Sequence, residues 1–497
     1  MRLPKRRGGQ MKYGNSGINF ENSYLSLNEV MYSKIEAKNN YNPTLEVLNE
    51  QLALELGIDI QYLTSESGLK LLSGSIGSDV NYTFAQAYSG HQFGHLSQLG
   101  DGRAMILGEH VTTSKTRYDI QLKGSGRTPY SRSGDGKATL YSMLREYIIS
   151  EAIYSLNIPT ARSLAVLKTN ELVQRNELTS GAILSRVAKS HIRVGTFSHA
   201  LMHSGYDALK ELADYTINRH YNHINNEPDK YVKFLAEVID RQSSLIAKWQ
   251  SVGFVHGVMN TDNVLISGET IDYGPCAFMD EYDNKTVFSS IDKNGRYSYG
   301  NQPYIGSWNM ARFTETIMHL FDKDKDKALE IANNELSKFD ELYHKHYISI
   351  MALKLGIKEH KESDKDLSDQ LLSLMETHKE DYTNTFKNLT INDLESISMS
   401  NSKEFKEWYK KWLKRLKDSD VTIEVAREIM MKHNPVIIPR NSIVENALID
   451  ASKLNDYSLY NELLELLKDP FNYKKEIRAD LLVPNSKSKK YVTFCGT

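Results

Sequence analysis

The chain of 497 residues has little cysteine, no excess of charge of either sign and no long apolar run. Its two cysteines, Cys276 and Cys495, exclude a disulfide framework and a cysteine-rich zinc site and fit a reducing compartment, so we expect a cytoplasmic protein. The formal net charge of −2 argues against binding nucleic acid or an anionic membrane through bulk electrostatics. No run reaches the roughly eighteen apolar residues that a membrane-spanning helix requires. Any anionic ligand must therefore be bound by a local site.

The N-terminal segment MRLPKRRGGQ is basic, but no apolar region follows it, so it does not have the pattern of a secretory signal. It also lacks the amphipathic Arg and Ser pattern of a transit peptide. We expect residues 1–17 to form a disordered basic tail, with a natural start at Met11 as the alternative.

The rest of the chain changes in texture along its length. From about residue 76 to 200, glycines separate short apolar runs such as AMILGE and YDIQLK, which predicts strands joined by tight turns. The segment LYSMLREYIISEAIYSLNI has apolar residues at helical spacing and is followed by Pro159, which predicts a helix that begins near Leu140. Residues 205–250 and most of the chain after about residue 307 also have helical patterns. The sequence thus predicts a Gly-rich α+β part followed by a helical part.

The segment GFVHGVMNTDNVLISGETIDYGP, residues 253–275, carries candidate metal ligands. A short hairpin through its SGE turn would bring Asn263 and Asp272 to the same end. Two oxygen ligands suit Mg²⁺, which usually takes one or two protein ligands beside phosphates and water. His256, Asn263 and the tripeptide Asp-Tyr-Gly also follow the order of a kinase catalytic loop and its metal-binding element.

A kinase-like site also needs a glycine-rich turn, a strand lysine and a helix glutamate, in that order. The turn LGDGR supplies Gly100 and Gly102, the strand YDIQLK ends at Lys123, and the following helix supplies Glu146. Singly, paired glycines usually mark a turn, a lysine usually reaches solvent along the surface and a helix glutamate usually faces water. The ordered set favours a nucleotide site.

Several positions depart from the kinase pattern. The residue two after His256 is Val258, where a kinase has the aspartate that accepts the substrate proton; Asp262 is the nearest replacement, although a turn or helix-capping role would also explain it. Arg103 lies inside the glycine turn, and Arg186 and Arg193 follow downstream. Guanidinium groups bind phosphates in a bidentate manner, which suggests a triphosphate held differently from that in a kinase; surface salt bridges are the alternative.

Long, specific stretches of the sequence can be compared with known families: YSGHQFGHLSQLGDGRAMILGE, QLKGSGRTPYSRSGDGKATLYSMLREYIISEA, NIPTARSLAVL, HGVMNTDNVLI, DYGPCAFMD, the early NFENSYLSL and the late NPVIIPRNSIVENAL. Together they closely resemble the selenoprotein O (SelO/YdiU) family over residues 18–497. The resemblance implies a two-lobed protein-kinase-like α+β fold with a helical C-terminal extension. It also implies a protein adenylyltransferase that binds ATP in a reversed orientation and transfers AMP to Ser, Thr or Tyr hydroxyls of proteins; some bacterial relatives are associated with UMP transfer.

The resemblance also implies roles for individual residues. The nucleotide site would contain Gly100, Gly102, Arg103, Lys123, Asp135, Gly136, Arg186, Arg193 and Asp272. Glu146 would pair with Lys123, and Asp262 would accept the proton. Asn263 and Asp272 would hold Mg²⁺, with Mn²⁺ as the alternative. The partners would be ATP and proteins with hydroxyl side chains, without nucleic acid or membrane, and the protein would be a monomer.

The expected domains are a basic tail (1–17), an N-terminal nucleotide-binding lobe (18–185), a C-lobe core (186–306) and a helical extension (307–497). Two other readings of the site stay open: a phosphotransferase that uses Asp262 as base, and an inactive nucleotide-binding scaffold, which Val258 would explain. Eukaryotic family members end in a Cys-selenocysteine pair, but this chain ends YVTFCGT. A Cys276–Cys495 disulfide is therefore one alternative, and a buried, inert Cys276 is the other.

Overall fold

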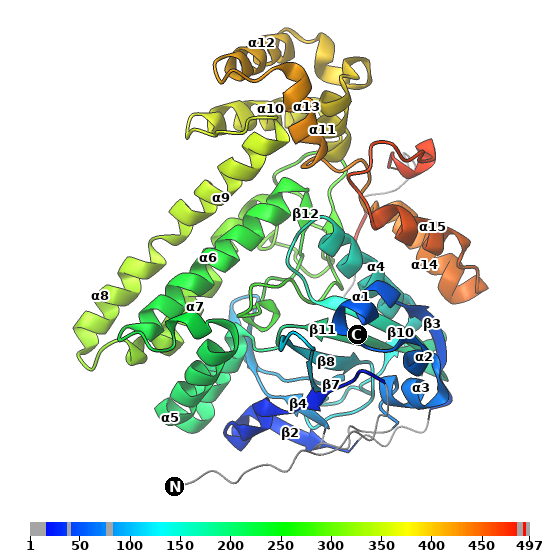
Figure 1. Cartoon of the computed structure of the whole chain (residues 1–497), viewed down its shortest axis with the longest axis vertical. Coiled ribbons are helices and arrows are strands. Elements are labelled where there is room, and N and C mark those ends of the chain that lie inside the picture. Colours follow the sequence, from blue (N-terminus) through cyan, green and yellow to red (C-terminus); the bar gives the residue numbers. More distant parts are fainter. Residues whose placement is uncertain (1–15, 37–40, 76–82, 485–490, 494–497) are drawn as a thin grey trace.

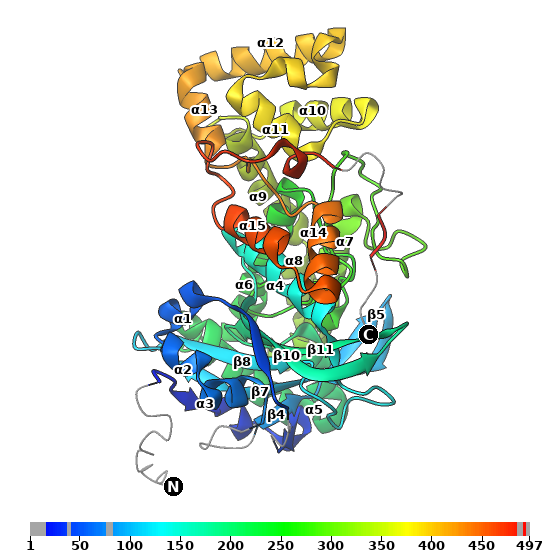
Figure 2. The same cartoon turned by 90° about the vertical axis from the view of Figure 1, so that its right-hand side faces the viewer.

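The computed structural model describes residues 16–36, 41–75, 83–484 and 491–493. Most of the expected basic tail, residues 1–17, lies outside these residues, as does Cys495. An antiparallel sheet at one end is joined to a mainly helical lobe, with more helices at the far end (Figures 1 and 2). This mixed α+β architecture is consistent with the kinase-like fold expected from the sequence. Among the described residues, no helix is both long and apolar enough to cross a bilayer.

The large sheet contains most strands of the N-terminal part of the chain. Its order is β2-β4-β7-β8-β11-β10-β3, and these neighbouring strands pair in antiparallel fashion. The bounds are β2 Tyr32–Ile35, β3 Thr44–Leu48, β4 Thr83–Gln86, β7 Ala104–Val111, β8 Arg117–Lys123, β10 Arg162–Gln174 and β11 Leu178–Ala188; β1 Phe20–Glu21 pairs with β7, and β9 Ala138–Thr139 with β11. The apolar runs AMILGE and YDIQLK thus form the expected strands, at the centre of the sheet.

Helices cover both faces of this sheet. Successive residues of β7 point to opposite faces, so Ile106 belongs to the core on the α4 side while Met105 and Leu107 belong to a second apolar cluster. The second cluster includes the short helices α1 Glu50–Leu56, α2 Ile60–Thr64 and α3 Glu66–Leu72. The sheet is therefore covered on both sides, which explains why β7 is buried along its whole length.

The helix α4, Leu140–Ser155, crosses one face of the sheet and confirms the expected helix. Thr139 caps its start, because its hydroxyl oxygen accepts a hydrogen bond from the backbone N–H of Ser142. Most of its side chains are buried, including the charged Arg145 and Glu146. A helix buried all round needs partners on its outer side as well as on the sheet.

The helical lobe and its extension follow the sheet in the chain. The helices are α5 Val194–His220, α6 Lys230–Ser251, α7 Gln302–Ile317, α8 Lys325–Leu336, α9 Phe339–Lys354, α10 Asp364–His378, α11 Tyr382–Ile391, α12 Lys403–Lys417, α13 Ile423–Met431, α14 Asn441–Ile449 and α15 Ser458–Leu467. Two small sheets pair β5 Ser89–Gln92 with β6 His95–Gln98, and β12 Phe254–Val255 with β13 Ala277–Phe278. Helices α10–α13 lie at the end opposite the large sheet (Figure 2).

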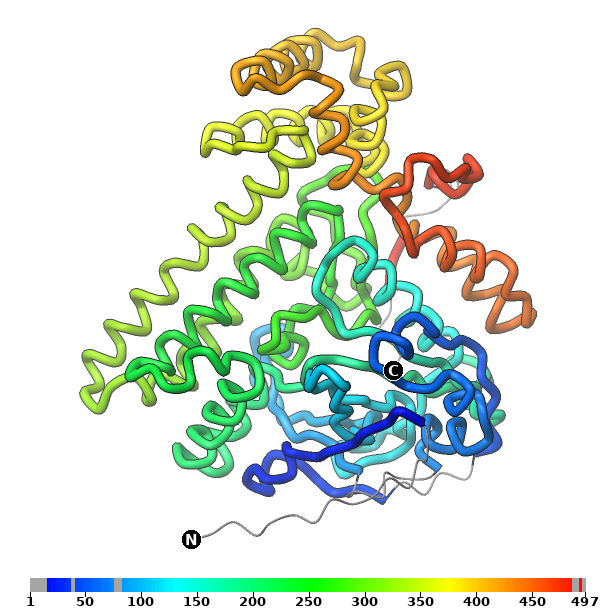
Figure 3. The backbone as a smooth tube through the Cα atoms, in the orientation of Figure 1, coloured from blue at the N-terminus to red at the C-terminus, as the bar shows by residue number. Residues whose placement is uncertain are grey.

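The last two helices return from the far end to α4 (Figure 3). The hydroxyl of Tyr460 on α15 donates to the carbonyl of Leu144 at 3.0 Å, and that of Tyr141 on α4 donates to Glu445 on α14 at 2.5 Å. Two expected domain boundaries fall inside elements, since β11 is continuous across 185/186 and α7 across 306/307. The division into domains otherwise stays a prediction.

Candidate active site

An ionic cluster of three buried residues and the partly exposed Asp272 lies between the sheet, α4 and the Asp-Tyr-Gly element. Lys123, the last residue of β8, has its ammonium nitrogen 2.5 Å from a carboxylate oxygen of Glu146 and 2.5 Å from Asp272. Arg186, on the neighbouring β11, donates to the other oxygen of Glu146 and has its guanidinium 3.5 Å from Asp272. The structure thus brings together the lysine, glutamate and aspartate that the sequence order suggested, and adds Arg186 to them.

The charges of this cluster stabilise one another. Burial raises the pKa of Asp272, but the attraction of Lys123 and Arg186 outweighs it and holds the pKa well below its usual range. Burial likewise opposes ionisation of Glu146, while Arg186 and Lys123 lower its pKa overall. Both carboxylates are therefore ionised at neutral pH. Asp272 also has a left-handed backbone, φ 70°, which few non-glycine residues adopt and which is frequent at functional sites.

Two glycine-containing loops form the wall opposite this cluster. Gly100 has φ 130°, and a Cβ on it would lie 2.5 Å from the ring of Tyr130 in the second loop. Gly136 has φ 71°, and a Cβ there would overlap the carbonyl of Gly126. Between the glycines of the first loop, Asp101 accepts hydrogen bonds from Gln86 and Gln121. The glycines thus allow the loops to pack closely, and Asp101 fixes the first loop to the sheet.

These loops and the cluster enclose a cavity of about 320 Å³. Its lining includes Gly100, Gly102, Arg103, Lys123, Asp135, Gly136, Arg186, Arg193, Asp262, Asn263 and Asp272. Glu146 lines an adjoining cavity of about 270 Å³ together with Arg103, Lys123 and Asp272. Asp135 lies at the rim, where Arg175 binds its carboxylate at 2.8 Å, so its visible role is to hold the second loop. The residues that the sequence suggested for the site therefore share one cleft.

The catalytic loop supplies Asp262 and Asn263 from a short 3₁₀ turn, η4 Thr261–Asn263. One carboxylate oxygen of Asp262 is buried and has no hydrogen-bond partner among the described residues. Burial raises the pKa of Asp262 to about 6, although Arg193 opposes the shift. Arg193 also donates to the Asp262 carbonyl at 2.8 Å and pairs with Asp101 at 3.4 Å. Asp262 is therefore a candidate for the group that accepts a proton at this site.

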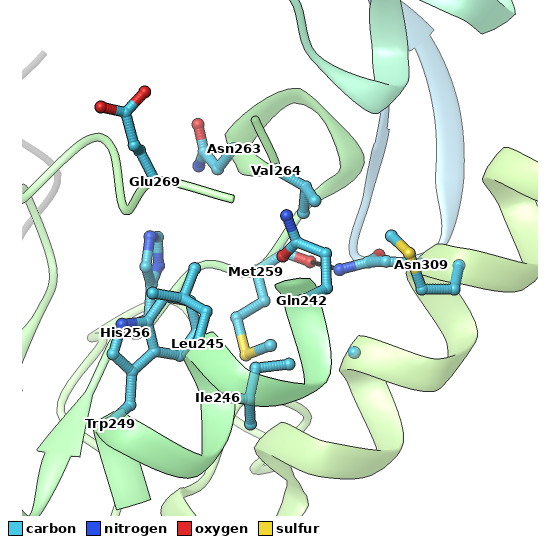
Figure 4. Close-up of a pocket in the computed structure, with 12 residues that line it drawn as sticks. Gln242, Leu245, Ile246, Trp249, His256, Met259, Asn263, Val264, Glu269 and Asn309 are labelled. Carbon is cyan, nitrogen blue, oxygen red and sulfur yellow. Dashed lines mark hydrogen bonds between the residues drawn. The ribbon is translucent and has the colours of Figure 1, made fainter. Parts of the chain in front are cut away.

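The back of the catalytic loop is held by the two long helices α6 and α7 (Figure 4). Asn309 donates to the Met259 carbonyl at 2.9 Å, and Gln242 donates to the Leu265 carbonyl at 2.8 Å. His256 is buried, and its ring nitrogen lies 3.0 Å from the Ile271 carbonyl, so it links the loop to the Asp-Tyr-Gly element. These contacts assign His256 a positioning role.

The hairpin expected over residues 264–271 does not form. The backbone N–H of Gly268 donates to the Leu265 carbonyl, so the turn exists, but Leu265 bridges to Arg193 and Thr270 bridges to Thr160. The two arms therefore pair with segments that are distant in the sequence. The pattern of apolar and polar residues within the segment itself cannot reveal these partners. Asn263 and Asp272 nevertheless face the same cavity.

Sequence reasoning missed Asp101, Gln121 and the hairpin β5–β6. Asp101 lies between two glycines already assigned to the site, which is a signal that could have been used. Gly90 of β5 lies so close to the catalytic loop that a Cβ on it would be 2.6 Å from Cγ of Asp262. No local pattern in the sequence indicates this contact. Cys276 is fully buried, and burial raises the pKa of its thiol to about 12, as expected for an inert thiol.

The oxygen donors at the cleft fit a hard divalent cation. Asp272 offers a carboxylate and Asn263 a carboxamide, and both residues line the same cavity. Two protein ligands are sufficient where phosphates complete the coordination of Mg²⁺. Among the described residues, no group of three or more His, Cys, Asp or Glu side chains could hold a metal by itself. A cation at this site would therefore bind together with the nucleotide.

A two-lobed fold, a buried lysine–glutamate pair and a cationic cleft that lacks the usual kinase base define a kinase-like nucleotidyltransferase. Comparison with known families agrees, since residues 15–468 match the family model described as "Protein adenylyltransferase SelO". The chain belongs to the SelO family.

Bacterial relatives are similar over almost their whole length. A protein named "Protein nucleotidyltransferase YdiU" from Clostridium botulinum (strain Alaska E43 / Type E3) is 54% identical over 483 residues, covering 97% of this chain and 98% of the relative. Proteins of the same name from Bacillus cereus (strain G9842) and Geobacillus kaustophilus (strain HTA426) are each 51% identical, covering 98% and 97% of this chain and 100% of each relative.

Proposed function

We propose that the protein transfers AMP from ATP to serine, threonine or tyrosine hydroxyls of other proteins. The observation that carries the proposal is the position of Asp262, a buried carboxylate with an unpaired oxygen, on the same cavity as several cations. These cationic side chains include Arg103, Lys123, Arg186 and Arg193. The family description and the names of the relatives support nucleotidyl transfer to protein.

In the proposed reaction, the acceptor hydroxyl oxygen attacks the α-phosphorus of ATP. A new O–P bond forms, and the bond from the α-phosphorus to its bridging oxygen breaks and releases pyrophosphate. The hydroxyl proton passes to Asp262, whose pKa of about 6 leaves it mostly ionised at neutral pH yet basic enough to accept that proton. Lys123 and Arg186, both fixed by Glu146, would donate to phosphate oxygens and neutralise the charge that develops there.

Mg²⁺ held by Asn263 and Asp272, with Mn²⁺ as the alternative, would neutralise the pyrophosphate leaving group when bound. Gly100, Gly102 and Gly136 would let the two loops approach the nucleotide closely. Attack at the α-phosphorus, rather than at the γ-phosphorus, is what the reversed orientation of ATP would require. The extra guanidinium groups of the cleft, absent from the kinase pattern, support it.

Labelled ATP tests this proposal directly. Candidate acceptor proteins are incubated with the enzyme, Mg²⁺ and ATP that carries its label either at the α- or at the γ-phosphate. We expect the acceptor to retain the α label and to gain the mass of AMP. An Asp262→Asn variant should lose transfer, whereas Asp240→Asn, a surface aspartate paired with His346, should not. If the acceptor retains the γ label instead, the protein is a phosphotransferase. If it retains neither label, the protein is a nucleotide-binding scaffold. Either result would overturn the proposal.

The same assay with UTP tests UMP transfer, which the resemblance implies for some relatives. We also propose that the protein acts in the cytoplasm, on the ground of its two cysteines, and without nucleic acid or membrane partners, on the ground of its near-zero net charge. The resemblance to the family adds the proposal of a monomer. Light scattering coupled to size-exclusion chromatography would check the monomer: a molar mass near 56.7 kDa is expected, and twice that value would contradict it.

A further inference from the structure

The hairpin β5–β6 lies on the catalytic loop and extends the active-site surface. The backbone N–H of His91 donates to the hydroxyl of Thr261 at 2.8 Å, and a ring nitrogen of His91 lies 3.1 Å from the same oxygen. Thr261 directly precedes Asp262 in the chain. At the hairpin tip, the backbone N–H of Phe93 donates to Asn260, one residue earlier. The hairpin is thus bonded to the residues that carry the proposed base.

Three side chains gather around Trp308 of α7, namely those of His91, Arg296 and Arg312. The rings of His91 and Trp308 meet edge to face with centroids 5.5 Å apart. The guanidinium carbons of Arg296 and Arg312 lie 4.8 Å and 5.1 Å from the centre of the Trp308 ring. We call His91, Arg296, Trp308 and Arg312 the Trp308 patch. Cation–π contacts of this kind fix guanidinium groups in place without consuming all of their hydrogen-bond donors.

The patch has more positive than negative charge. Arg312 pairs with Glu315 at 2.6 Å, but Arg296 has no carboxylate within ion-pair distance among the described residues. The Nε atoms of both arginines are buried, and neither has a hydrogen-bond partner among the described residues. Burial and the nearby Arg312 lower the pKa of His91, so the ring is neutral at pH 7 and does not repel the arginines. The uncompensated charge therefore resides on Arg296.

We propose that the Trp308 patch binds an anionic group of the protein substrate, close to the hydroxyl that is modified. Guanidinium groups offer parallel N–H donors that match the oxygens of a carboxylate or phosphate. The occupant is an acidic peptide segment, and the link through His91 and Thr261 places it beside Asp262. Its identity as substrate rests on the proposed function, but anion binding by the patch does not.

The test uses four synthetic peptides with one serine flanked by Glu, by Gln, by Lys or by phosphoserine. Binding to the full-length protein is measured by isothermal titration calorimetry, without ATP, so that no chemistry is needed. We expect the Glu or phosphoserine peptide, or both, to bind at least about tenfold more tightly than the Gln peptide, since charge-assisted hydrogen bonds are worth 1.5–3 kcal/mol. The stronger of the two identifies the source of the anion.

Variants decide whether the patch is responsible. Arg296→Gln should remove the preference for the acidic peptide, and Arg296→Lys should restore part of it. Arg478→Gln, which removes an exposed arginine paired with Glu462 and Asp480, should not change it. Equal binding of the Glu and Gln peptides to the parent, or an unchanged preference in Arg296→Gln, would overturn the proposal. ATP affinity and the thermal unfolding midpoint of each variant verify that it is folded.

Adding α-labelled ATP separates this inference from the proposed function. If the acidic peptide binds but acquires no label, AMP transfer to peptides is refuted and the proposal for the Trp308 patch still holds. If label enters the Glu and Gln peptides at equal rates, the proposal for the Trp308 patch is refuted and the proposed transfer reaction still holds.

Discussion

Gly90 of β5 is the residue whose replacement by alanine should separate catalysis from folding. Its backbone is outside the left-handed region, so alanine is sterically allowed there. The added methyl carbon would lie 2.6 Å from Cγ of Asp262 and 2.7 Å from a methyl carbon of Leu99. Carbon atoms in contact are normally about 3.5–4.0 Å apart, so the carboxyl group must move by about 1 Å. Both neighbours are ends of side chains that can rotate, so the fold should survive.

A shift of 1 Å in a catalytic group can lower the rate about a hundredfold. We therefore expect Gly90→Ala to reduce kcat for AMP transfer about a hundredfold, measured with α-labelled ATP. The affinity for ATP should change less than about twofold, because Lys123 and the arginines of the cleft are not displaced. Ser89→Ala is the matched control on the same strand, since it removes a buried hydroxyl that has no partner among the described residues and adds no atoms. A kcat for Gly90→Ala within threefold of the parent would refute the reasoning.

Four further outcomes follow from the same cleft. Because the raised pKa of Asp262 means that the folded state holds its proton up to about pH 6, kcat/KM should fall roughly tenfold between pH 7 and pH 5. Above that pH the buried carboxylate of Asp262 is ionised, which costs folding stability. Asp262→Asn should therefore unfold at a higher temperature than the parent at pH 8 but not at pH 4. Equal thermal unfolding midpoints at pH 8 would contradict the raised pKa. Gly100→Ala should weaken ATP binding at least about tenfold by calorimetry, since its φ of 130° and the Tyr130 ring exclude a side chain; unchanged affinity would contradict this role of the loop. Lys123→Met should abolish transfer and lower the free energy of unfolding by about 3 kcal/mol in urea titrations, because Glu146 and Asp272 lose the ammonium group between them. A variant as stable as the parent would show that the Lys123–Glu146 pair is not coupled to folding.

The sequence predicted the parts of the site that follow a linear order. Strand, lysine, helix and glutamate occur along the chain in the order in which the sheet and α4 present them, so the Lys123–Glu146 pair could be expected before its geometry was known. The helix from Leu140 was equally clear, because its apolar spacing and the following Pro159 agree.

The remaining features depend on contacts between distant segments. The expected hairpin after Asn263 fails because Leu265 and Thr270 pair with Arg193 and Thr160, at separations that local periodicity does not report. The contact of β5 with the catalytic loop spans 170 residues between His91 and Thr261. A raised pKa for Asp262 requires the burial that this contact creates, so it could not be read from the segment TDN alone.

The return of α14 and α15 to α4 sets the order in which the protein can mature during its synthesis. The hydrogen bonds Tyr141–Glu445 and Tyr460–Leu144 span 304 and 316 residues. At 5–20 residues per second, a ribosome needs about 15–60 s to make the intervening chain. During that time, α4, the helix that carries Glu146, lacks these two hydrogen bonds on its outer side. The outer side of α4 is therefore completed only after Tyr460 has been made, near the end of synthesis.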